Sequence, residues 1–483
     1  MRPAISFILD GKPRYVEFGP GSHVTPTTTV LNYLRSLPDH KSVKEGCAEG
    51  DCGACTLVLG ERGGDGKLCY SSVDSCLMFL PMLDGKQLVT TENLRGKDGT
   101  LHPVQSAMVN SGGSQCGYCT PGIIMSLFSL YKNHNRPERR EIDDALTGNL
   151  CRCTGYKPIV EAAATACIHH GVDDFSVHES EMLHLMDALP RDSLRIETGS
   201  QRYFRPRSLG EALSIKHQYP DAIVICGSTD VALRVTKRHE ALSEILDLSA
   251  IDSLRHIEET ADAVTIGSAT SLTDVLGQTR NSLPALATML DVFGSQQIRN
   301  LATLGGNIGT ASPIGDTLPV LLAYGTKVAL ESLNGHREVA LDGYFTGYRK
   351  TIRQPGELIT SVIIPKPGER VIIKSYKISK RKDLDISTVS AGFRLEVRDG
   401  LVHKIVLAYG GMAERVKRAT TTEQAILGRT WERVTIEQAS RLIDDDFTPI
   451  SDARAGAEMR RIAAKNLLIK FWFETSIATK DIS

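Results

Sequence analysis

The sequence lacks an excess of charge of either sign and lacks any long apolar run. Its 56 basic and 57 acidic residues leave a formal net charge of −1. This balance excludes an overall field that would draw the chain to nucleic acid or to anionic lipid. No stretch approaches the ~18 consecutive apolar residues that a membrane span needs, and the first residues lack the apolar run of a signal peptide. We therefore expect a cytoplasmic protein that binds its partners through specific sites.

Internal repeats and low-complexity segments are also missing, as is the GxGxxG fingerprint of a Rossmann dinucleotide site. At 483 residues the chain is too long for a single core. Alternating Ile5, Phe7 and Leu9 before Asp10-Gly11 predict a β-hairpin. Residues 121–134 predict a helix that places Ile124, Leu127, Leu130 and Tyr131 on one face. We predict a multidomain α+β protein.

Cysteine is nearly absent from the last two thirds of the chain. Ten of the eleven cysteines precede residue 170, and only Cys226 follows. In a reducing compartment, thiols concentrated in this way favour metal or redox chemistry over disulfides. The N-terminal third is therefore the predicted metal-binding part.

The first cysteine set has the spacing of a plant-type 2Fe-2S ferredoxin, C-x4-C-x2-C with a distant fourth ligand. Its members are Cys47, Cys52, Cys55 and Cys76. Gly46, Gly50 and Gly53 would let backbone N–H groups approach the sulfurs. The alternative is zinc, but structural zinc sites favour separated C-x2-C pairs. Cys69 fits the spacing less well, and we expect it to be an ordinary buried thiol.

The second cysteine set consists of Cys116, Cys119, Cys151 and Cys153. Helix positions i and i+2 point about 200° apart, so the C-x-C pair must lie in a turn. Gly117 and Gly155 stand beside the two pairs. Turns at helix ends could then hold a four-thiolate site, and helix N-termini would favour a negative cluster. Spacing alone leaves both an iron–sulfur cluster and zinc open.

Taken together, "GCAEGDCGACT", "SCL", "CGYCTPG" and "GNLCRCTGY" resemble, in order, the iron–sulfur segments of the molybdenum hydroxylases, the family of xanthine dehydrogenase and aldehyde oxidase. The resemblance implies two 2Fe-2S clusters, one on each cysteine set, the first near a flavin and the second near a molybdenum cofactor. It also implies that Gln115 hydrogen-bonds the pterin of that cofactor. The alternative for Gln115 is a solvated loop amide.

Two small-residue stretches, "IVICGSTDVAL" and "TLGGNIGTASPIGD", each offer a loop whose N–H groups could face a pyrophosphate. Alone, each could equally be an ordinary turn. Both resemble the flavin-binding segments of the same family. The FAD contacts that the resemblance implies are Ile225, Cys226, Gly227, Ser228, Thr229, Asp230, Val231, Ala232, Phe293, Gly305, Gly306, Asn307, Asp316 and Lys377.

Lys377 could alternatively be a surface lysine on a charged loop. By the same resemblance, Tyr348 and residues 380–386 would border NAD+, although oxidase relatives keep much of the same sequence.

The resemblance runs from about residue 4 to 475 and implies four domains. These are a ferredoxin-like β-grasp 2Fe-2S domain (1–92), a helical-bundle 2Fe-2S domain (93–170), an α+β FAD-binding domain (198–369) and a C-terminal α+β flavoprotein domain (370–483). Residues 171–197 are predicted to be a linker. No molybdopterin-binding domain follows, so the molybdenum centre is expected on a separate large subunit, in an α2β2 heterotetramer.

The implied activity is that of the electron-transfer subunit of a xanthine dehydrogenase. Electrons from xanthine or hypoxanthine oxidation on the partner would pass through both clusters to FAD and on to NAD+. This chain would itself supply no catalytic residue. One alternative is the equivalent subunit of a molybdenum hydroxylase that acts on aldehydes or N-heterocycles. The other is a zinc-binding interaction protein without a redox cofactor.

Overall fold

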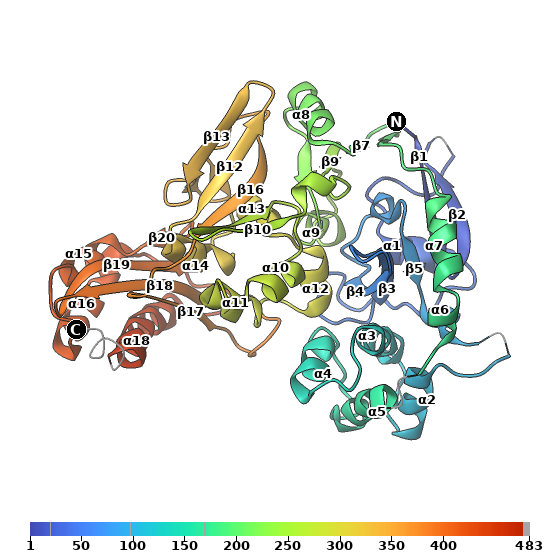
Figure 1. Cartoon of the computed structure of the whole chain (residues 1–483), viewed down its shortest axis with the longest axis horizontal. Helices are drawn as coiled ribbons and strands as arrows, with labels where there is room; N and C mark the ends of the chain where they lie inside the picture. The colour runs from blue at the N-terminus through green and yellow to red at the C-terminus, as the bar shows by residue number, and fades with distance from the viewer. Residues whose placement is uncertain (20, 97, 169–170, 477–483) are drawn as a thin grey trace. The chain divides into compact units, whose positions relative to one another are not determined.

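The computed structural model describes residues 1–19, 21–96, 98–168 and 171–476, so the end of the last predicted domain, 477–483, lies outside the described residues. The chain forms two compact units, which we describe separately (Figure 1). The first unit comprises Met1–Ile215, Asp221–Ala250 and Ser295–Ala302. The second comprises Lys216–Pro220, Ile251–Gly294 and Thr303–Ser483.

The N-terminal part of the first unit is a five-stranded sheet in the order β2-β1-β5-β3-β4, with one helix, α1, in a β-grasp arrangement. The predicted hairpin is confirmed, because β1 and β2 pair antiparallel on either side of Asp10 and Gly11. Ile5, Phe7 and Leu9 enter one core, and Ile8 enters a second core on the other face of the sheet. The elements are β1 (Ala4–Leu9), β2 (Lys12–Glu17), α1 (Val30–Ser36), β3 (Thr56–Arg62), β4 (Leu68–Asp74), η1 (Leu80–Leu83), β5 (Gln87–Val89) and η2 (Thr91–Leu94).

A helical module packs against this sheet (Figure 1). Its helices are α2 (Pro103–Asn110), α3 (Thr120–Asn133), α4 (Arg139–Leu146) and α5 (Lys157–Ile168). The helix predicted over residues 121–134 is confirmed as α3, and its burial extends beyond the predicted apolar face to every side from Gly122 to Tyr131. It lies between β3 and β4 of the sheet and the helices α2, α4 and α5. A helix surrounded in this way has no solvent-facing side that would require polar residues.

The first unit also contains a four-stranded sheet in the order β6-β7-β9-β8. The helix α12, which follows much later in the sequence, belongs to this unit as well. The predicted linker contains α6, α7 and β6, and the division into domains stays a prediction. The elements are α6 (Asp174–Val177), α7 (Glu179–Asp187), β6 (Leu194–Glu197), β7 (Arg202–Arg205), α8 (Leu209–Gln218), β8 (Ile223–Ile225), α9 (Ala232–Thr236), β9 (Glu244–Asp247) and α12 (Gln296–Leu301).

The second unit contains a five-stranded sheet in the order β10-β11-β16-β12-β13, a four-stranded sheet in the order β17-β18-β19-β20 and the short pair β14-β15. Its strands are β10 (Ile257–Glu259), β11 (Ala263–Gly267), β12 (Lys327–Ser332), β13 (Gly335–Ala340), β14 (Phe345–Gly347), β15 (Lys350–Thr351), β16 (Leu358–Pro365), β17 (Val371–Ile378), β18 (Val389–Arg398), β19 (Leu401–Gly410) and β20 (Lys417–Arg418).

The helices of the second unit cover these sheets, and α14 packs directly on β18 and β19. They are η3 (Asp252–Leu254), α10 (Leu272–Thr279), α11 (Pro284–Leu290), α13 (Leu304–Thr310), α14 (Thr317–Tyr324), α15 (Thr420–Ile426), α16 (Arg433–Ser440), α17 (Ile443–Asp446) and α18 (Ala457–Thr475). Across the described parts of both units, no helix combines the length and the apolar character needed to cross a membrane.

Candidate metal and cofactor sites

The first cysteine set gathers where the loop between α1 and β3 meets the end of β4. The Sγ atoms of Cys55 and Cys76 lie 3.3 Å apart. The thiols of Cys47 and Cys52 are hydrogen-bonded to each other. A 2Fe-2S cluster is held by four cysteines, two on each iron. The arrangement in two pairs therefore suits such a cluster.

The backbone of this loop faces the sulfur atoms. The N–H groups of Glu49 and Asp51 donate to Cys47 Sγ at 3.4 and 3.2 Å. Together with a hydrogen bond from the Cys52 thiol, the largest cause, they lower the pKa of Cys47 to about 6. Gly53, at φ +65°, provides a conformation that L side chains rarely adopt. The loop thus favours a thiolate, which is the form that ligates metals.

The sequence reasoning missed Asp74 and was wrong about Cys69. Asp74 is fully buried, and its Oδ1 atom accepts a hydrogen bond from Cys55 Sγ at 3.6 Å. Burial, and then the nearby Cys47, raise the pKa of this carboxyl to about 8.

Cys69 is exposed, not buried. It lies on the edge strand β4, where alternation turns Leu68 and Tyr70 to the core and Cys69 away from it.

The second cysteine set gathers at helix ends. Cys119 is the N-cap of α3, and Cys151 and Cys153 lie in the loop between α4 and α5. The prediction that the C-x-C pair lies in a turn is confirmed. Hydrogen bonds pair Cys116 with Cys153 and Cys119 with Cys151. This set is therefore also arranged in two pairs.

The members of the second set differ in exposure. Cys116 and Cys153 are exposed, whereas Cys151 is buried. Burial would raise the pKa of Cys151, but bonds from the Thr154 hydroxyl and from backbone N–H groups outweigh it and lower this pKa to about 7. Gln115 precedes Cys116 on the exposed side, and its predicted contact with a pterin stays a prediction.

Over the described ranges, no three His, Cys, Asp or Glu side chains were found grouped as ligands of a single metal ion. The thiols meet in pairs instead.

The first predicted flavin segment lies in the first unit, between β8 and α9. Gly227 has no space for a side chain, because a Cβ atom would lie 1.7 Å from Leu301 O. Ser228, in the left-handed region at φ +56°, donates its hydroxyl to Leu77 O. Lys237, which follows α9, donates to Cys47 O at 3.0 Å. This segment is therefore fixed against the module that carries the first cysteine set.

The second predicted flavin segment lies in the second unit, and part of the prediction is wrong. Residues 304–310 form the helix α13, not a loop. The Thr303 side chain caps this helix by accepting a hydrogen bond from Gly306 N at 3.0 Å. A Cβ atom on Gly305 would lie 2.6 Å from Ser268 O, so the glycine allows close packing. The small residues therefore let the helix α13 pack closely against the backbone of Ser268.

Lys377 is a buried residue of the same unit, which contradicts the alternative of a surface lysine. Its side chain is 4% exposed and forms an ion pair of 3.0 Å with Asp316 Oδ2. Its Nζ atom also donates to Val292 O at 2.9 Å, directly before Phe293. Asp316 Oδ1 is buried and has no hydrogen-bond partner among the described residues. This oxygen can accept a hydrogen bond from a bound group.

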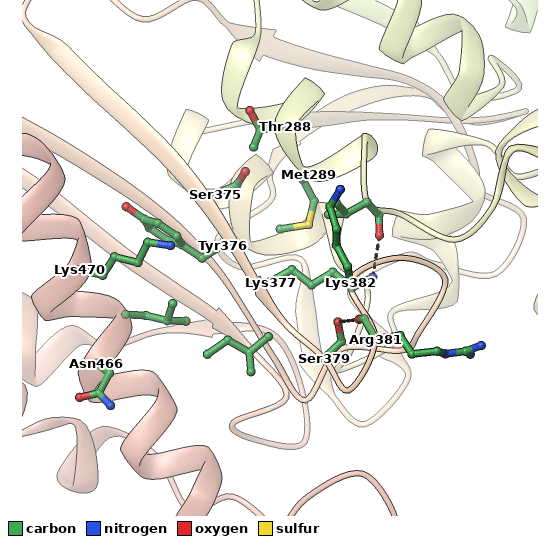
Figure 2. Close-up of a pocket in the computed structure, with 13 residues that line it drawn as sticks. Thr288, Met289, Ser375, Tyr376, Lys377, Ser379, Arg381, Lys382, Asn466 and Lys470 are labelled. Carbon is green, nitrogen blue, oxygen red and sulfur yellow. Dashed lines mark hydrogen bonds between the residues drawn. The ribbon is translucent and has the colours of Figure 1, made fainter. Parts of the chain in front are cut away.

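A pocket of about 580 Å³ adjoins Lys377 (Figure 2). It lies between α11, the end of β17 and α18. Arg381, Lys382 and Lys470 line it together with Tyr376, and none of its described lining residues is Asp or Glu. Three of its basic residues pair with carboxylates beside the pocket, Lys377 with Asp316, Arg381 with Asp385 and Lys470 with Glu474. Tyr348, the other residue predicted near NAD+, is exposed in the turn between β14 and β15, and its role stays a prediction.

Family models match three segments of the chain. Residues 90–164 match a [2Fe-2S] binding domain, and residues 196–367 match the FAD binding domain in molybdopterin dehydrogenase. Residues 374–475 match the CO dehydrogenase flavoprotein C-terminal domain. The matches contain the second cysteine set, the predicted flavin segments and Lys377.

Curated relatives extend this similarity over the whole chain. Xanthine dehydrogenase/oxidase of Gallus gallus is 33% identical over 96% of this chain and 39% of its own length. Aldehyde oxidase 2 of Mus musculus is 30% identical over 94% of this chain and 38% of its own length. The chain thus spans about two fifths of the length of these relatives.

A solved structure supports the same assignment. A chain of carbon monoxide dehydrogenase from Hydrogenophaga pseudoflava, in a form that lacks the Mo-pyranopterin moiety, superposes with a TM-score of 0.53 at 25% identity. The match covers 56% of this chain and 94% of the other. With two paired cysteine sets and the matching flavoprotein modules, the chain belongs to the molybdenum hydroxylase family, of which it carries the iron–sulfur and FAD-binding part.

Proposed function

We propose that the chain is the electron-transfer subunit of a xanthine dehydrogenase. One observation carries the proposal: a single chain combines two sets of four cysteines, each arranged in two thiol pairs, with a flavoprotein module. Four thiolates in two pairs are the ligand set of a 2Fe-2S cluster. The similarity to xanthine dehydrogenase/oxidase of Gallus gallus favours xanthine over other substrates.

The cysteines of the first set would hold one 2Fe-2S cluster and those of the second set another. When bound, the clusters would supply one-electron transfer, and FAD would supply two-electron chemistry, taking up two electrons with a proton and giving a hydride to NAD+. The chain's own residues hold the iron and tune its environment through burial and N–H···S bonds, as Glu49 and Asp51 do at Cys47.

For FAD, we propose contacts from residues 225–232 and from Phe293, Gly305, Gly306, Asn307, Asp316 and Lys377. Two observations fit a flavin in the second unit. The Asp316 Oδ1 atom lacks a partner, and Lys377 holds a positive charge beside it in a buried place. A buried polar atom without a partner is costly, and a ligand would satisfy it. Lys377 would also orient Val292 O and hence the backbone before Phe293.

The proposed partner is a separate large subunit that binds the molybdenum cofactor, in an α2β2 assembly. The exposed thiols Cys116 and Cys153, with Gln115 beside them, are the proposed face toward that partner. A second candidate function is the equivalent subunit of an enzyme that oxidises aldehydes, which the similarity to aldehyde oxidase 2 favours. Selection of the substrate would lie on the partner chain, and both proposals use the same cysteines.

The deciding experiment isolates the chain with any large subunit that co-purifies and measures its cofactors and turnover. We expect a brown complex with about four irons and one FAD per copy of this chain, which reduces NAD+ with xanthine. Turnover of an aldehyde instead of xanthine would select the second candidate. Reduction of oxygen as fast as NAD+ would contradict the dehydrogenase assignment. A reconstituted protein that holds only zinc would contradict both candidates.

A further inference from the structure

Asn149 lies where the two cysteine loops meet, two residues before Cys151. Its side chain is 5% exposed. The Nδ2 atom donates to Gly53 O at 3.1 Å and to Thr56 Oγ1 at 3.3 Å. Gly53 stands between Cys52 and Cys55, so these bonds join the loop of the second cysteine set to the loop of the first. Directly after Asn149, Leu150 N donates to Cys52 O at 3.0 Å.

Hydrogen bonds also fix the oxygen end of the Asn149 amide. Its Oδ1 atom accepts hydrogen bonds from Ser126 Oγ of α3 at 2.6 Å and from Gln297 Nε2 of α12 at 3.1 Å. Gln297 Nε2 also donates to Ser126 Oγ at 2.9 Å. Gln297 is fully buried. An asparagine amide has two donor hydrogens and two acceptor positions. Every one of these positions in Asn149 makes a hydrogen bond, so the side chain cannot rotate without losing some of them.

The groups around the Asn149 amide are packed so closely that no atom could be added between them. A Cβ atom on Gly53 would lie 2.3 Å from Gly148 O, and one on Gly122 of α3 would lie 2.1 Å from Gly53 O. A Cβ atom on Gly148 would lie 2.3 Å from Gln297 Oε1. Backbone from the first cysteine loop, from α3 and from the second cysteine loop is therefore in direct contact. Interiors packed in this way transmit small displacements.

The helix α12 fastens this cluster of groups to further elements of the first unit. Arg299 Nη2 donates to Asp144 Oδ1 of α4 at 2.6 Å, and Asn300 Nδ2 donates to Ser72 O of β4 at 2.8 Å. In chain order, α12 lies between Phe293 and Gly305, both proposed to contact the flavin. The same short helix thus bonds the second cysteine loop, α3, α4 and β4, and in chain order it lies between the flavin segments.

We infer that Asn149, clamped by Ser126 and Gln297, is a positioning residue that fixes the two cysteine loops against each other and so sets the spacing of the two cluster sites. The inference rests on the proposed function, because it needs a cluster on each cysteine set. The amide touches neither a proposed ligand sulfur nor a substrate. It acts through backbone groups adjacent to Cys52 and Cys151.

The test uses the holoprotein with its full chain and compares two matched pairs of variants. Asn149→Asp replaces the donating amide by an oxygen that faces Gly53 O. Asn133→Asp, on the same unit, makes the same substitution at an exposed asparagine, whose amide donates to Tyr70 O at 2.7 Å and Ser129 O at 2.9 Å. Ser126→Ala removes one buried hydroxyl of α3. Ser129→Ala removes another on the same helix, which donates only to Tyr70 O.

The readout is the magnetic splitting between the two reduced clusters in EPR spectra, which depends steeply on their separation. We expect Asn149→Asp and Ser126→Ala to change the splitting and to slow electron transfer between the clusters. Ser129→Ala should lower the melting temperature about as much as Ser126→Ala, because both serines are buried, and Asn133→Asp should lower it less than Asn149→Asp. Both control variants should keep the wild-type splitting. If Asn149→Asp fails to fold, the milder Ser126→Ala still decides. Equal splittings in all four variants would overturn the inference alone. A wild-type holoprotein without two clusters would overturn the proposed function and the inference with it.

Discussion

The two cysteine sites use the same four-thiol chemistry but are built in opposite ways. The first site is formed by a glycine-rich loop against a sheet, and Cys55 and Cys76 are 2% and 1% exposed. The second site is formed at helix ends, and two of its four thiols, Cys116 and Cys153, are exposed. Solvent and a partner can therefore reach the second site more readily than the first, in which Cys47 and Cys52 are only partly exposed.

The pKa values of the thiols follow the burial and hydrogen bonds of each thiol and do not divide between the two sites. In the first site, the Cys76 thiol, desolvation and the buried Asp74 raise the pKa of Cys55 well above its ordinary value. In the second site, a backbone N–H near Tyr118 is the main cause that lowers the pKa of Cys116. The directions also differ within each site, because a hydrogen bond from Cys52 lowers the pKa of Cys47 to about 6 and burial raises the pKa of Cys119 to about 12. The comparison teaches that one ligand set can be made deep or accessible by the choice of supporting element.

The largest expected effect is the loss of one cluster on replacing a proposed ligand. We predict that Cys76→Ser and Cys153→Ser each leave about two of four irons and each remove a different one of the two EPR signals. Cys76→Ser should also lower the thermal stability, since its thiol is buried, whereas Cys153→Ser should not. Cys69→Ser is the control and should keep both signals. Two intact signals in Cys153→Ser would remove it from the ligand set.

Removal of the metal should next separate the two sites by their accessibility. On incubation of the folded holoprotein with an iron chelator, the EPR signal that Cys153→Ser abolishes should decay several-fold faster than the signal that Cys76→Ser abolishes. The reason is that the chelator reaches the exposed Cys116 and Cys153 without local unfolding. Binding of the large subunit should slow this decay. Faster decay of the signal that Cys76→Ser abolishes would contradict the proposed difference in accessibility between the two sites.

A pair of glycine substitutions tests how tightly each site is packed. Gly117 and Gly53 both have positive φ, +82° and +65°. Gly117→Ala meets nothing within 4 Å and should cost only the backbone strain, about 1–2 kcal/mol. Gly53→Ala would also strike Gly148 O and Asn149, which adds about 1–3 kcal/mol of overpacking. Urea denaturation of the two variants measures the difference, and equal losses would contradict it.

An effect of similar size concerns the carboxylate that supports the helical module around the second site. Asp173 pairs with Lys132 at 2.9 Å and with His102 at 3.2 Å. Burial alone would raise the pKa of Asp173, but hydrogen bonds from His102, Lys132 and Ser176 hold it below its ordinary value. Asp173→Asn should therefore cost about 1.5–3 kcal/mol at pH 7, the range for bonds to a charged group.

The pH dependence of this loss follows from the lowered pKa. A carboxyl with a depressed pKa in the folded state contributes stability that is present above its unfolded pKa, about 3.9, and is lost as the pH falls below it. The difference between the Asp173→Asn variant and the wild type should thus shrink below about pH 4. Hydrogen exchange of the amides of α2 and α3, compared at equal pH, measures it. A difference that does not change with pH would contradict the assignment to this carboxylate.

The cysteine spacing was sufficient to predict which thiols come together. A loop as short as Cys47–Cys55, with glycines that permit left-handed backbone, has few ways to place its sulfurs, and the C-x-C geometry of Cys151 and Cys153 excludes a helix. The hairpin at Asp10-Gly11 was predictable for the same local reason. The family assignment also rested on such local segments, and the comparisons confirm it.

Residues that act through distant contacts were not predictable. Nothing in the local sequence shows that Gln297 lies against Asn149, or that the edge position of β4 exposes Cys69. The small-residue stretch at Gly305 predicts a loop whose N–H groups could face a pyrophosphate. The packing against Ser268 and the Thr303 cap decided otherwise.

By itself, the sequence determined the local chemistry of this protein: eight cysteines at ligand spacing, glycines where the backbone must turn, and segments typical of a flavoprotein. The tertiary structure alone decided which cysteines are exposed, which carboxyl lies buried beside a thiol, and which amide joins the two cysteine loops. The physical reason is the distance along the sequence over which each property is determined. Ligand spacing and backbone conformation are set by neighbours a few residues away, whereas burial and long-range hydrogen bonds depend on elements that only folding brings together.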